Sequence, residues 1–413
     1  MNAGVVIVGA GQAGYQVAAS LREAGYREPI ALVGDEPNAP YERPPLSKAF
    51  LTGEAAASEL EIRPARFFTD RAICTVLGRR AVGVDRVARR VRLDDGTVLA
   101  YAHLVLATGA RPRMLAIPGH DLPGVHTLRT HEDAEALRAA LRVARDVVVV
   151  GGGFLGLEVA SGVAKLGSHV TVIEAAPRPM ARAVSPPTAD WFAQAHRTAG
   201  VSLELGTTIA EVVDEGGTVA GVRTDDGRVI PADVVLVAVG VAAEDELARA
   251  AGLETSNGVV VDATLTTSDP HVSAVGDCAA FPSGEHGGLI RLESVQNATD
   301  HGRAVAARLT GSPQAYRAVP WFWSEQGTWK LQIAGIATGA DTFVVRGEMG
   351  TGRFSVFCFH DGRLVAVESV NRPADHVAAR RMLAGGMLPG PDEVRDELFD
   401  ARAFLSALAA GPR

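Results

Sequence analysis

Residues 147–160 read VVVVGGGFLGLEVA, and residues 5–18 read VVIVGAGQAGYQVA. Each stretch places an apolar β-branched run before three glycines spaced GxGxxG and then continues with a helical pattern. The glycines of the two copies are Gly9, Gly11 and Gly14, then Gly151, Gly153 and Gly156. The two stretches therefore predict two dinucleotide-binding folds in one chain. They differ at one chemically important position, where the first has Gln16 and the second has Glu158.

Each fingerprint predicts a site for a pyrophosphate. The first glycine allows a tight turn, the second lets the backbone approach the phosphates, and the third lets helix and strand pack closely. An acid about 20 residues further on accepts hydrogen bonds from ribose hydroxyls. The candidates are Asp35 and Glu36 in the first copy and Glu174 in the second. Because an acid repels a 2′-phosphate, Glu174 favours NADH, while the nearby Arg178 leaves NADPH open.

Two such sites are explained most simply if one cofactor stays bound and the other visits. A nicotinamide needs a group to reduce, and a flavin is the usual resident partner. The sequence therefore predicts a flavin at one fingerprint and a nicotinamide dinucleotide at the other.

The composition is typical of a globular protein of two or three domains, with 413 residues of which 47% are hydrophobic. The net charge of -8 argues against general nucleic-acid binding. Its apolar runs are shorter than the roughly 18 residues of a membrane span, and its N-terminus lacks the features of a signal peptide. We therefore expect a cytoplasmic protein that binds neither nucleic acid nor membrane.

The three cysteines, Cys74, Cys278 and Cys358, are far apart in the sequence. This spacing excludes a disulfide framework, a structural zinc site and a CxxC dithiol. We expect no metal site, and we expect Cys278 to be a small buried residue.

Alternating apolar runs and helical patterns predict mostly parallel sheets. Each nucleotide unit is followed by a β-meander with a DDG turn, at residues 94–96 and 225–227. From about Val319 the sequence alternates as antiparallel strands do, and a helical tail follows. The predicted fold is α/β, with two Rossmann-like dinucleotide-binding domains and a C-terminal α+β domain.

The order of several motifs resembles the pyridine-nucleotide flavoprotein reductases with a glutathione-reductase-like fold. These motifs are the first fingerprint, PYERPPLSK at 40–48, LVLATGARPR at 104–113, the second fingerprint, VSAVGDCA at 272–279 and VPWFWSEQ at 319–326. The sequence is most similar to NADH-dependent ferredoxin reductases that serve bacterial haem-thiolate monooxygenases and ring dioxygenases. This resemblance implies an FAD-binding domain at 1–110 and 246–318, an NADH-binding domain at 111–245 and a C-terminal interface domain at 319–413.

The resemblance also assigns roles to individual residues. It places Lys48, Glu158, Glu293 and Trp323 at the reacting centre, with Glu158 pointing across the nicotinamide site towards Lys48. The residues it implies for FAD, beyond the first fingerprint, are Asp35, Glu36, Arg43, Lys48, Ala107, Thr108, Gly109, Arg129, Gly276, Asp277, Val295, Trp321 and Trp323. Those implied for NADH are the second fingerprint, Glu158 and Glu174.

Disulfide reductases of this fold carry a cysteine pair beside the flavin, and the matching stretch here, RPPLSKAF, has Ser47 and no thiol. Electrons are therefore expected to leave the flavin directly for an external acceptor. The expected partner is a 2Fe-2S ferredoxin, reduced with electrons from NADH through FAD. Reduction of rubredoxin or monodehydroascorbate stays open, as does an NADH-sensing flavoprotein of the apoptosis-inducing-factor type.

A ferredoxin is typically acidic, so docking on this acidic chain needs a local basic patch. The candidates are the arginine-rich run 79–92 and the group Arg372, Arg380 and Arg381. We expect a monomer or a weak homodimer.

Overall fold

The computed structural model describes residues 4–283, 287–386 and 388–409. The chain forms two compact units, and each unit contains one fingerprint. The first unit comprises Met1–Glu42, Ala57–Arg111 and Val241–Ala318, and the second comprises Arg43–Ala56, Pro112–Gly240 and Val319–Arg413.

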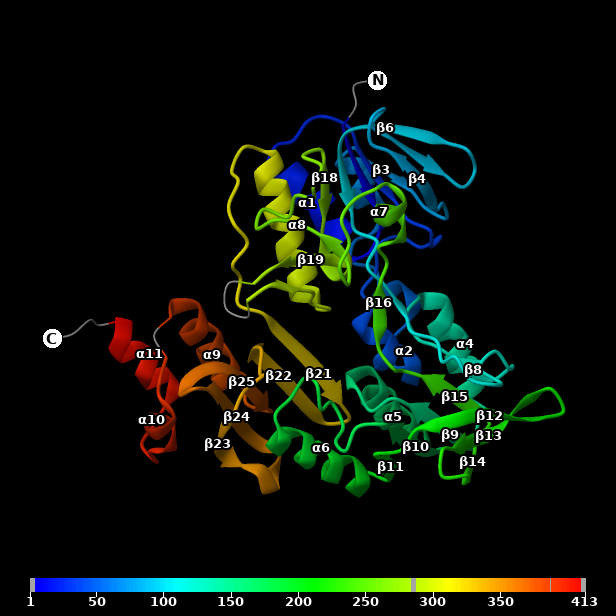
Figure 1. Ribbon diagram of the computed structural model, residues 1–413, viewed down its shortest axis with the longest axis vertical. Helices are drawn as coiled ribbons and strands as arrows, with labels where there is room; N and C mark the ends of the chain where they lie inside the picture. The colour runs from blue at the N-terminus through cyan, green and yellow to red at the C-terminus, as the bar shows by residue number, and fades with distance from the viewer. Residues whose placement is uncertain (1–3, 284–286, 387, 410–413) are drawn as a thin grey trace. The chain divides into compact units, whose positions relative to one another are not determined.

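A seven-stranded sheet forms the centre of the first unit (Figure 1). Its parallel strands are β1 (Gly4–Val8), β2 (Ile30–Val33), β3 (Ile73–Val76), β6 (Val98–Leu106) and β18 (Val272–Ala274). β4 (Ala81–Asp85) and β5 (Arg90–Leu93) extend the sheet antiparallel from β6. Val8 pairs with both Val33 and Leu106, so these three strands end at the same edge, where the first fingerprint begins.

Helices α1 (Gln12–Glu23) and α8 (Val295–Leu309) pack closely against each other. A Cβ atom on Gly302 of α8 would lie 2.8 Å from the Cβ of Gln16, so this crossing requires glycine. The other elements of this unit are η2 (Ala57–Glu59), α3 (Ala65–Asp70), β16 (Val241–Ala243), α7 (Glu246–Ala250), β17 (Val259–Val260), η3 (Gly276–Cys278), β19 (Ala279–Pro282) and β20 (Leu289–Ile290). Strand β7 (Ala110–Pro112) begins in this unit, and its last residue belongs to the second.

The second unit repeats the parallel plan. Its five-stranded sheet has the order β11-β10-β9-β15-β8, with β8 (Val125–His126), β9 (Asp146–Val150), β10 (His169–Glu174), β11 (Val201–Leu205) and β15 (Val234–Val237). A separate antiparallel meander contains β12 (Ile209–Glu215), β13 (Thr218–Thr224) and β14 (Val229–Pro231). The helices are α4 (His131–Leu141), α5 (Phe154–Leu166) and α6 (Pro186–Thr198). The short η1 (Pro44–Ser47) and α2 (Ala49–Thr52) also belong to this unit.

The C-terminal part of the second unit is an antiparallel sheet with helices. Its order is β21-β22-β25-β24-β23, from β21 (Trp321–Gln326), β22 (Trp329–Gly335), β23 (Thr342–Glu348), β24 (Arg353–His360) and β25 (Arg363–Val370). Helix α9 (Pro373–Gly385) lies against β22 and β25. The remaining elements are η4 (Met349–Thr351), α10 (Pro391–Arg395) and α11 (Ala401–Ala409).

The predicted fold class is confirmed: two nucleotide-binding folds of parallel strands and helices precede an antiparallel C-terminal domain. The predicted turn at residues 94–96 joins β5 to β6, and the one at 225–227 joins β13 to β14. Among the residues that the structure describes, no helix is both long and apolar enough to cross a membrane.

Candidate functional site

The first fingerprint forms a turn that only glycine can make. Gly9 has φ +112°, and a Cβ atom on it would lie 2.0 Å from the carbonyl oxygen of Ala107. A Cβ on Gly14 would lie 1.9 Å from the carbonyl oxygen of Gly9. By contrast, no described atom lies within 4 Å of the Cβ position of Gly11. The turn is therefore closed by packing at its first and third glycines and open at its second.

Other predicted FAD residues meet this turn within the first unit. Ala107, which begins the Ala107-Thr108-Gly109 turn, donates its backbone N–H to Val8 at 2.7 Å. Gly276 has φ +72°, and its Cβ position lies 2.9 Å from the Cβ of Ala13 in α1. The predicted ATG and GD turns therefore both lie beside the β1–α1 fingerprint.

Two further candidates of the first unit, Asp277 and Glu293, are linked through Arg291. Its guanidinium donates to the backbone oxygen of Asp277 at 3.0 Å and pairs with Glu293 at 2.7 Å. Glu293 lies two residues before Val295, which begins α8. These two contacts fix the backbone of the Gly276-Asp277 turn relative to Glu293.

The two ribose-acid candidates of the first copy differ in their surroundings. Asp35 is exposed, whereas Glu36 is half-buried and accepts a hydrogen bond from the Tyr41 hydroxyl at 2.5 Å. The Tyr41 hydroxyl therefore orients the carboxylate of Glu36.

The second fingerprint has the same geometry as the first. Gly151 has φ +112°, with its Cβ position 2.4 Å from the carbonyl oxygen of Ala238. The Cβ position of Gly156 lies 2.0 Å from the carbonyl oxygen of Gly151, and that of Gly153 has no described atom within 4 Å. Each unit therefore presents one open middle glycine, Gly11 or Gly153.

The helices after the two fingerprints begin without a side-chain cap. Neither α1 nor α5 has a capping side chain or an acid in its first turn among the described residues. Their first N–H groups and the positive end of the helix dipole are thus available to a phosphate. Together with the open middle glycines, these helix ends fit one dinucleotide in each unit.

Glu174 is held in place by the second fingerprint. Its carboxylate accepts the backbone N–H of Gly152 at 2.7 Å and of Ala176 at 2.8 Å. Arg178, whose positive charge left NADPH as an alternative cofactor, pairs with Asp190 at 2.9 Å. This arrangement fixes an acid, rather than a base, at the end of β10.

Glu158 is the centre of a buried polar cluster in the second unit. Its Oε2 accepts from Lys48 Nζ at 2.8 Å and from Ser47 Oγ at 2.6 Å, and its Oε1 accepts from Ser324 Oγ at 2.7 Å. Lys48 also donates to the carbonyl oxygen of Pro44 at 3.0 Å. The exposed fractions of the side chains are 17% for Lys48 and 7% for Glu158. Such a buried charge needs these partners, because an unpaired one is costly.

The equivalent side chain of the first copy behaves differently. Gln16 Nε2 donates to Ser20 Oγ, one turn further along its own helix, at 2.8 Å. The fold therefore accommodates a neutral residue at this position, and the carboxylate of Glu158 serves the second copy specifically.

The two predicted tryptophans lie on β21. Their ring centroids are 5.7 Å apart, and the Arg380 guanidinium lies 4.5 Å from the Trp321 ring. His376 packs against Trp321 at 5.7 Å, and burial together with the charge of Arg380 lowers the pKa of this histidine to about 4. Because side chains alternate along a strand, Trp321 and Trp323 face away from the α5 side where Ser324 lies.

Five of the residues that the resemblance assigns to FAD belong to the second unit: Arg43, Lys48, Arg129, Trp321 and Trp323. Their contacts divide them into three groups. Arg43 donates to the carbonyl oxygen of Arg129 at 2.5 Å, and the backbone N–H of Arg129 donates to Asp133 at 2.9 Å. Lys48 pairs with Glu158, and the tryptophans adjoin α9.

The three cysteines are free, and Cys278 is buried as expected. Burial raises the pKa of the Cys278 thiol, which donates to the carbonyl oxygen of Val275 at 3.3 Å. Burial also raises the pKa of Cys358, whereas Cys74 is exposed. Neither buried thiol has the lowered pKa of a reactive cysteine.

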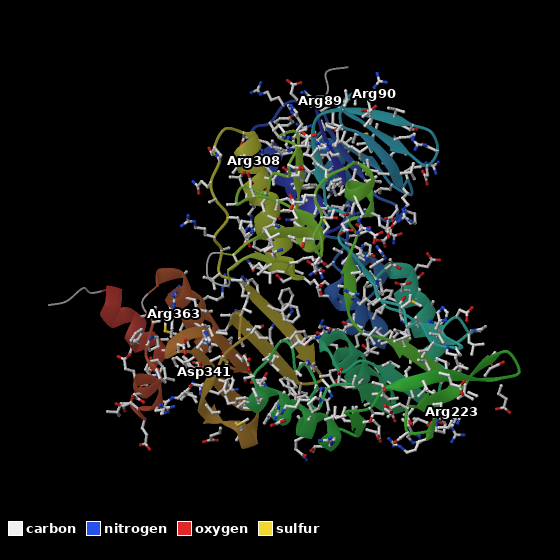
Figure 2. All side chains as sticks on the ribbon, in the orientation of Figure 1. Arg89, Arg90, Arg223, Arg308, Asp341 and Arg363 are labelled. Atoms are coloured by element: carbon white, nitrogen blue, oxygen red, sulfur yellow. The ribbon has the colours of Figure 1, made fainter. Side chains whose placement is uncertain are left out.

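Both candidate basic patches contain arginines that already have structural partners. In the run 79–92, Arg79 pairs with Asp95 and Arg86 with Asp269, while Arg89 contacts His271. Figure 2 shows Arg89 beside Arg90 at the turn between β4 and β5. In the second group, Arg372 pairs with Asp375 at 2.8 Å. Part of the charge of each patch is therefore already engaged in ion pairs within this chain.

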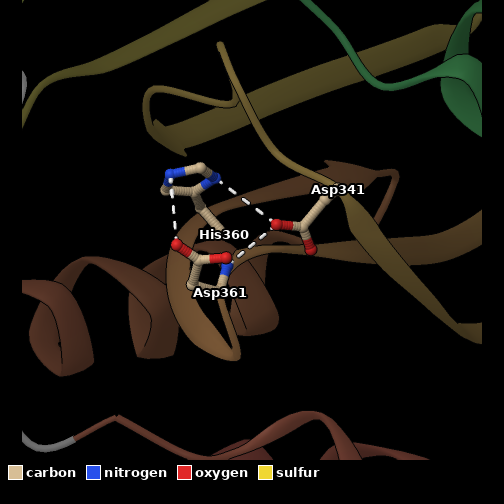
Figure 3. A group of neighbouring side chains, drawn as sticks. All are labelled: Asp341, His360 and Asp361. Carbon is tan, nitrogen blue, oxygen red and sulfur yellow. Dashed lines mark hydrogen bonds and ion pairs between the residues drawn. The ribbon is translucent and has the colours of Figure 1, made fainter.

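A group of metal-ligand residue types lies outside the predicted sites (Figure 3). His360 Nδ1 lies 3.4 Å from Asp341, and its Nε2 lies 3.8 Å from Asp361. The backbone N–H of Asp361 donates to Asp341 at 2.9 Å and lowers the pKa of that carboxyl. All three side chains are exposed. The group closes the β24–β25 turn, and we assign it no ligand.

Sequence reasoning missed four side chains of the Glu158 cluster and its surroundings. Ser47 and Ser324 bond Glu158 directly, Gln326 bonds Ser324, and His196 bonds Gln326. The sequence could have indicated two of them, because strand alternation in FWSEQ at residues 322–326 places Ser324 and Gln326 on one face. His196, on helix α6, carried no such signal.

With this geometry established, comparison with known proteins identifies the family. Residues 3–302 match the family model Pyridine nucleotide-disulphide oxidoreductase, and residues 321–405 match Reductase C-terminal. The chain belongs to the pyridine nucleotide-disulphide oxidoreductase family and carries its reductase C-terminal domain.

Its relatives include ferredoxin reductases of oxygenase systems. The chain is 51% identical to rhodocoxin reductase of Rhodococcus erythropolis, over 97% of this chain and 94% of that protein. The crystal structure of the ferredoxin reductase for the CYP199A2 system from Rhodopseudomonas palustris matches with a TM-score of 0.95 and 48% identity, covering 97% and 99% of the two chains. The structure of a covalent putidaredoxin reductase–putidaredoxin complex matches with a TM-score of 0.96 and 38% identity, covering 99% of each chain.

The protein is therefore an oxidoreductase and a flavoprotein, and the cofactors of its family are FAD and NAD(P)H. The two open fingerprints fit this pair of cofactors.

Proposed function

We propose that this protein transfers electrons from NADH through FAD to a 2Fe-2S ferredoxin that serves a haem-thiolate monooxygenase or a ring dioxygenase. The observation that carries the proposal is the pair of open fingerprints in a chain of which 97% matches the ferredoxin reductase for the CYP199A2 system. A bound flavin would supply a hydride acceptor for the nicotinamide and a donor of single electrons for the ferredoxin.

In this proposal, each fingerprint binds one of the two cofactors. Residues 1–110 and 246–318 hold FAD through Gly9, Gly11, Gly14 and the ATG and GD turns. Residues 111–245 bind NADH through Gly151, Gly153, Gly156 and Glu174. Residues 319–413 form the interface domain for the partner.

The preference for NADH over NADPH is supported by Glu174 and Arg178. Two backbone N–H groups hold the Glu174 carboxylate at the end of β10, and Arg178 is paired with Asp190. A fixed acid accepts from the ribose hydroxyls of NADH and repels the 2′-phosphate of NADPH.

The assignments at the reacting centre come from the family resemblance and stay predictions. They are Lys48, Glu158, Glu293 and Trp323. For Glu158, the support is the set of three donors that hold its buried carboxylate. A cytoplasmic location and a monomeric or weakly dimeric state also stay predictions.

The proposal is tested by offering the NADH-reduced protein three acceptors: a 2Fe-2S ferredoxin, a rubredoxin and monodehydroascorbate. We expect the fastest oxidation of the reduced flavin by the ferredoxin. Faster turnover with either other acceptor would reassign the enzyme. A long-lived reduced state that passes electrons to none of the three would indicate an NADH-sensing protein.

A further inference from the structure

One face of strand β21 is matched to one face of helix α5. Phe322, Ser324 and Gln326 alternate along the strand with Trp321, Trp323 and Glu325, so these first three side chains point to the same side. On α5, Phe154 and Glu158 lie one turn apart on one face. The Phe322 and Phe154 rings are 4.6 Å apart, and Ser324 Oγ lies 2.7 Å from Glu158 Oε1. The aromatic contact thus sets the register that brings the serine hydroxyl to the carboxylate.

Behind Ser324, a chain of hydrogen bonds leads to helix α6. Gln326 Nε2 lies 3.1 Å from Ser324 Oγ, and Gln326 Oε1 lies 2.8 Å from His196 Nε2. Ser324, Gln326 and His196 are fully buried, each with an exposed fraction of 0%. The bonds therefore form without competition from water.

The chemistry of the Gln326 amide fixes the direction in which this series of hydrogen bonds donates. An amide oxygen only accepts and an amide NH₂ only donates. His196, whose pKa is lowered by burial, is neutral and donates from Nε2 to Gln326. Ser324 accepts from Gln326, and its own hydroxyl proton is then available to Glu158. Each donor in the chain points towards the carboxylate.

The opposite orientation of the Gln326 amide is disfavoured by two contacts. It would draw the Ser324 proton away from Glu158 and leave that carboxylate oxygen without this donor. It would also place the amide oxygen, an acceptor, where the NH₂ now lies 3.4 Å from Met180 Sδ. This is unfavourable because a thioether sulfur is itself an acceptor.

Met180 connects the same amide to the second fingerprint. This residue has φ +53°, an uncommon backbone conformation for a side chain other than glycine. Its backbone N–H donates to the carbonyl oxygen of Gly152 at 2.9 Å. Gln326 therefore contacts both the chain to Glu158 and the loop that follows Glu174. Strained residues persist where their surroundings hold them, as here.

We propose that Ser324 and Gln326 are positioning residues that hold the Glu158 carboxylate for the bound nicotinamide nucleotide. Neither residue is a catalytic group, because both act through Glu158. The inference rests on the proposed NADH-dependent function and adds to it the residues that orient its acid. The first copy lacks the need for such a chain, since Gln16 bonds Ser20 of its own helix.

The test is a double-mutant cycle between Gln326→Leu and Glu158→Gln in the full-length flavoprotein. Two quantities are measured: the rate constant of flavin reduction by NADH and the dissociation constant of NAD⁺. We expect Gln326→Leu alone to change at least one of them by about tenfold, the upper end of what one hydrogen bond between neutral groups contributes. In the Glu158→Gln background the same change should have no further effect, because residues in one network are not additive.

Two further variants separate positioning from packing. Ser324→Ala should reproduce the loss, and Ser324→Thr, which keeps the hydroxyl, should restore most of it. The matched control is Ser355→Ala, which removes another fully buried serine hydroxyl that bonds Ser369 and Asp375 instead. We expect this control to leave both quantities unchanged. An ¹⁵N spectrum of His196 should show the proton on Nε2 in the wild-type protein.

Two results would overturn the proposal: equal effects of Gln326→Leu with and without the Glu158 carboxylate, or an inert Ser324→Ala variant. Either result, with normal reduction of the wild type by NADH, would leave the proposed function intact. If NADH does not reduce the wild-type flavin, the proposed function fails, and the cycle is decided by NAD⁺ affinity alone. A wild-type protein that neither is reduced nor binds NAD⁺ would contradict both.

Discussion

Gly11 and Gly153 offer a matched pair of substitutions that should separate the two cofactors. Both lie in extended backbone, with φ -80° and -76°, that any residue can adopt. A Cβ atom added at either position would have no described atom within 4 Å other than those of its chain neighbours. Replacing glycine lowers the entropy of the unfolded chain and so stabilises by about 0.4–1 kcal/mol. The poorer N-cap costs a similar amount. Gly11→Val and Gly153→Val should therefore change the free energy of unfolding by less than about 0.5 kcal/mol.

The effect on cofactor binding should be much larger. The valine side chain fills the space through which the backbone approaches a pyrophosphate. Overpacking of this kind costs about 1–3 kcal/mol, which corresponds to a roughly tenfold to hundredfold weaker cofactor. Gly153→Val should keep its flavin and bind NADH weakly, whereas Gly11→Val should fold but lose flavin.

The assay is the flavin-to-protein ratio from visible absorbance, together with the dissociation constant of NADH and a urea unfolding curve. Loss of flavin from Gly153→Val with retention in Gly11→Val would contradict the assignment of the two fingerprints. Normal affinity of both variants for both cofactors would contradict it as well.

Three further changes test individual residues. Glu158→Gln, which copies Gln16, leaves Lys48 without its ion-pair partner, so the free energy of unfolding in urea should fall by about 3 kcal/mol. Stopped-flow mixing should show slower reduction of the flavin by NADH, and a variant unchanged in both assays would show that Glu158 has neither role. Glu174→Ala should lower the ratio of kcat/KM for NADH over NADPH by about tenfold, as expected for a lost bond to a charged group, and an unaltered ratio would exclude Glu174 from ribose recognition. Burial lowers the pKa of His301 from 6.5 to about 3, so the unfolded chain takes up a proton below pH 6.5 that the native chain does not. Stability should therefore fall by about 2 kcal/mol for this residue between pH 6.5 and 5, and urea unfolding of His301→Leu should show a shallower decline; parallel pH profiles would contradict this assignment.

The sequence predicted the nucleotide-binding folds because their signals are local. An apolar strand, a glycine turn and a helix follow one another within each fingerprint, and the structure places β1 before α1 and β9 before α5 accordingly. The DDG turns carried similarly local information about the two meanders. Such features depend on backbone conformations that neighbouring residues dictate.

The surroundings of Glu158 were only partly predictable. The family resemblance pointed Glu158 towards Lys48, and the two make an ion pair. Ser324 lies 166 residues from Glu158 in the sequence, and His196 lies on another helix, α6. Their convergence depends on how β21 packs against α5, which no local pattern encodes. The pairing of Arg178 with Asp190 is likewise a tertiary contact, although it spans only part of one loop and helix.

The stoichiometry of electron transfer is the sharpest test of the proposed path from NADH through FAD to a ferredoxin. NADH supplies two electrons and a 2Fe-2S ferredoxin accepts one, so NADH oxidation and ferredoxin reduction should be followed together under anaerobic conditions with the purified protein. We expect two ferredoxin molecules reduced for each NADH oxidised, at a rate that depends on ferredoxin concentration. Rapid reduction of the flavin by NADH without reduction of ferredoxin would contradict the account.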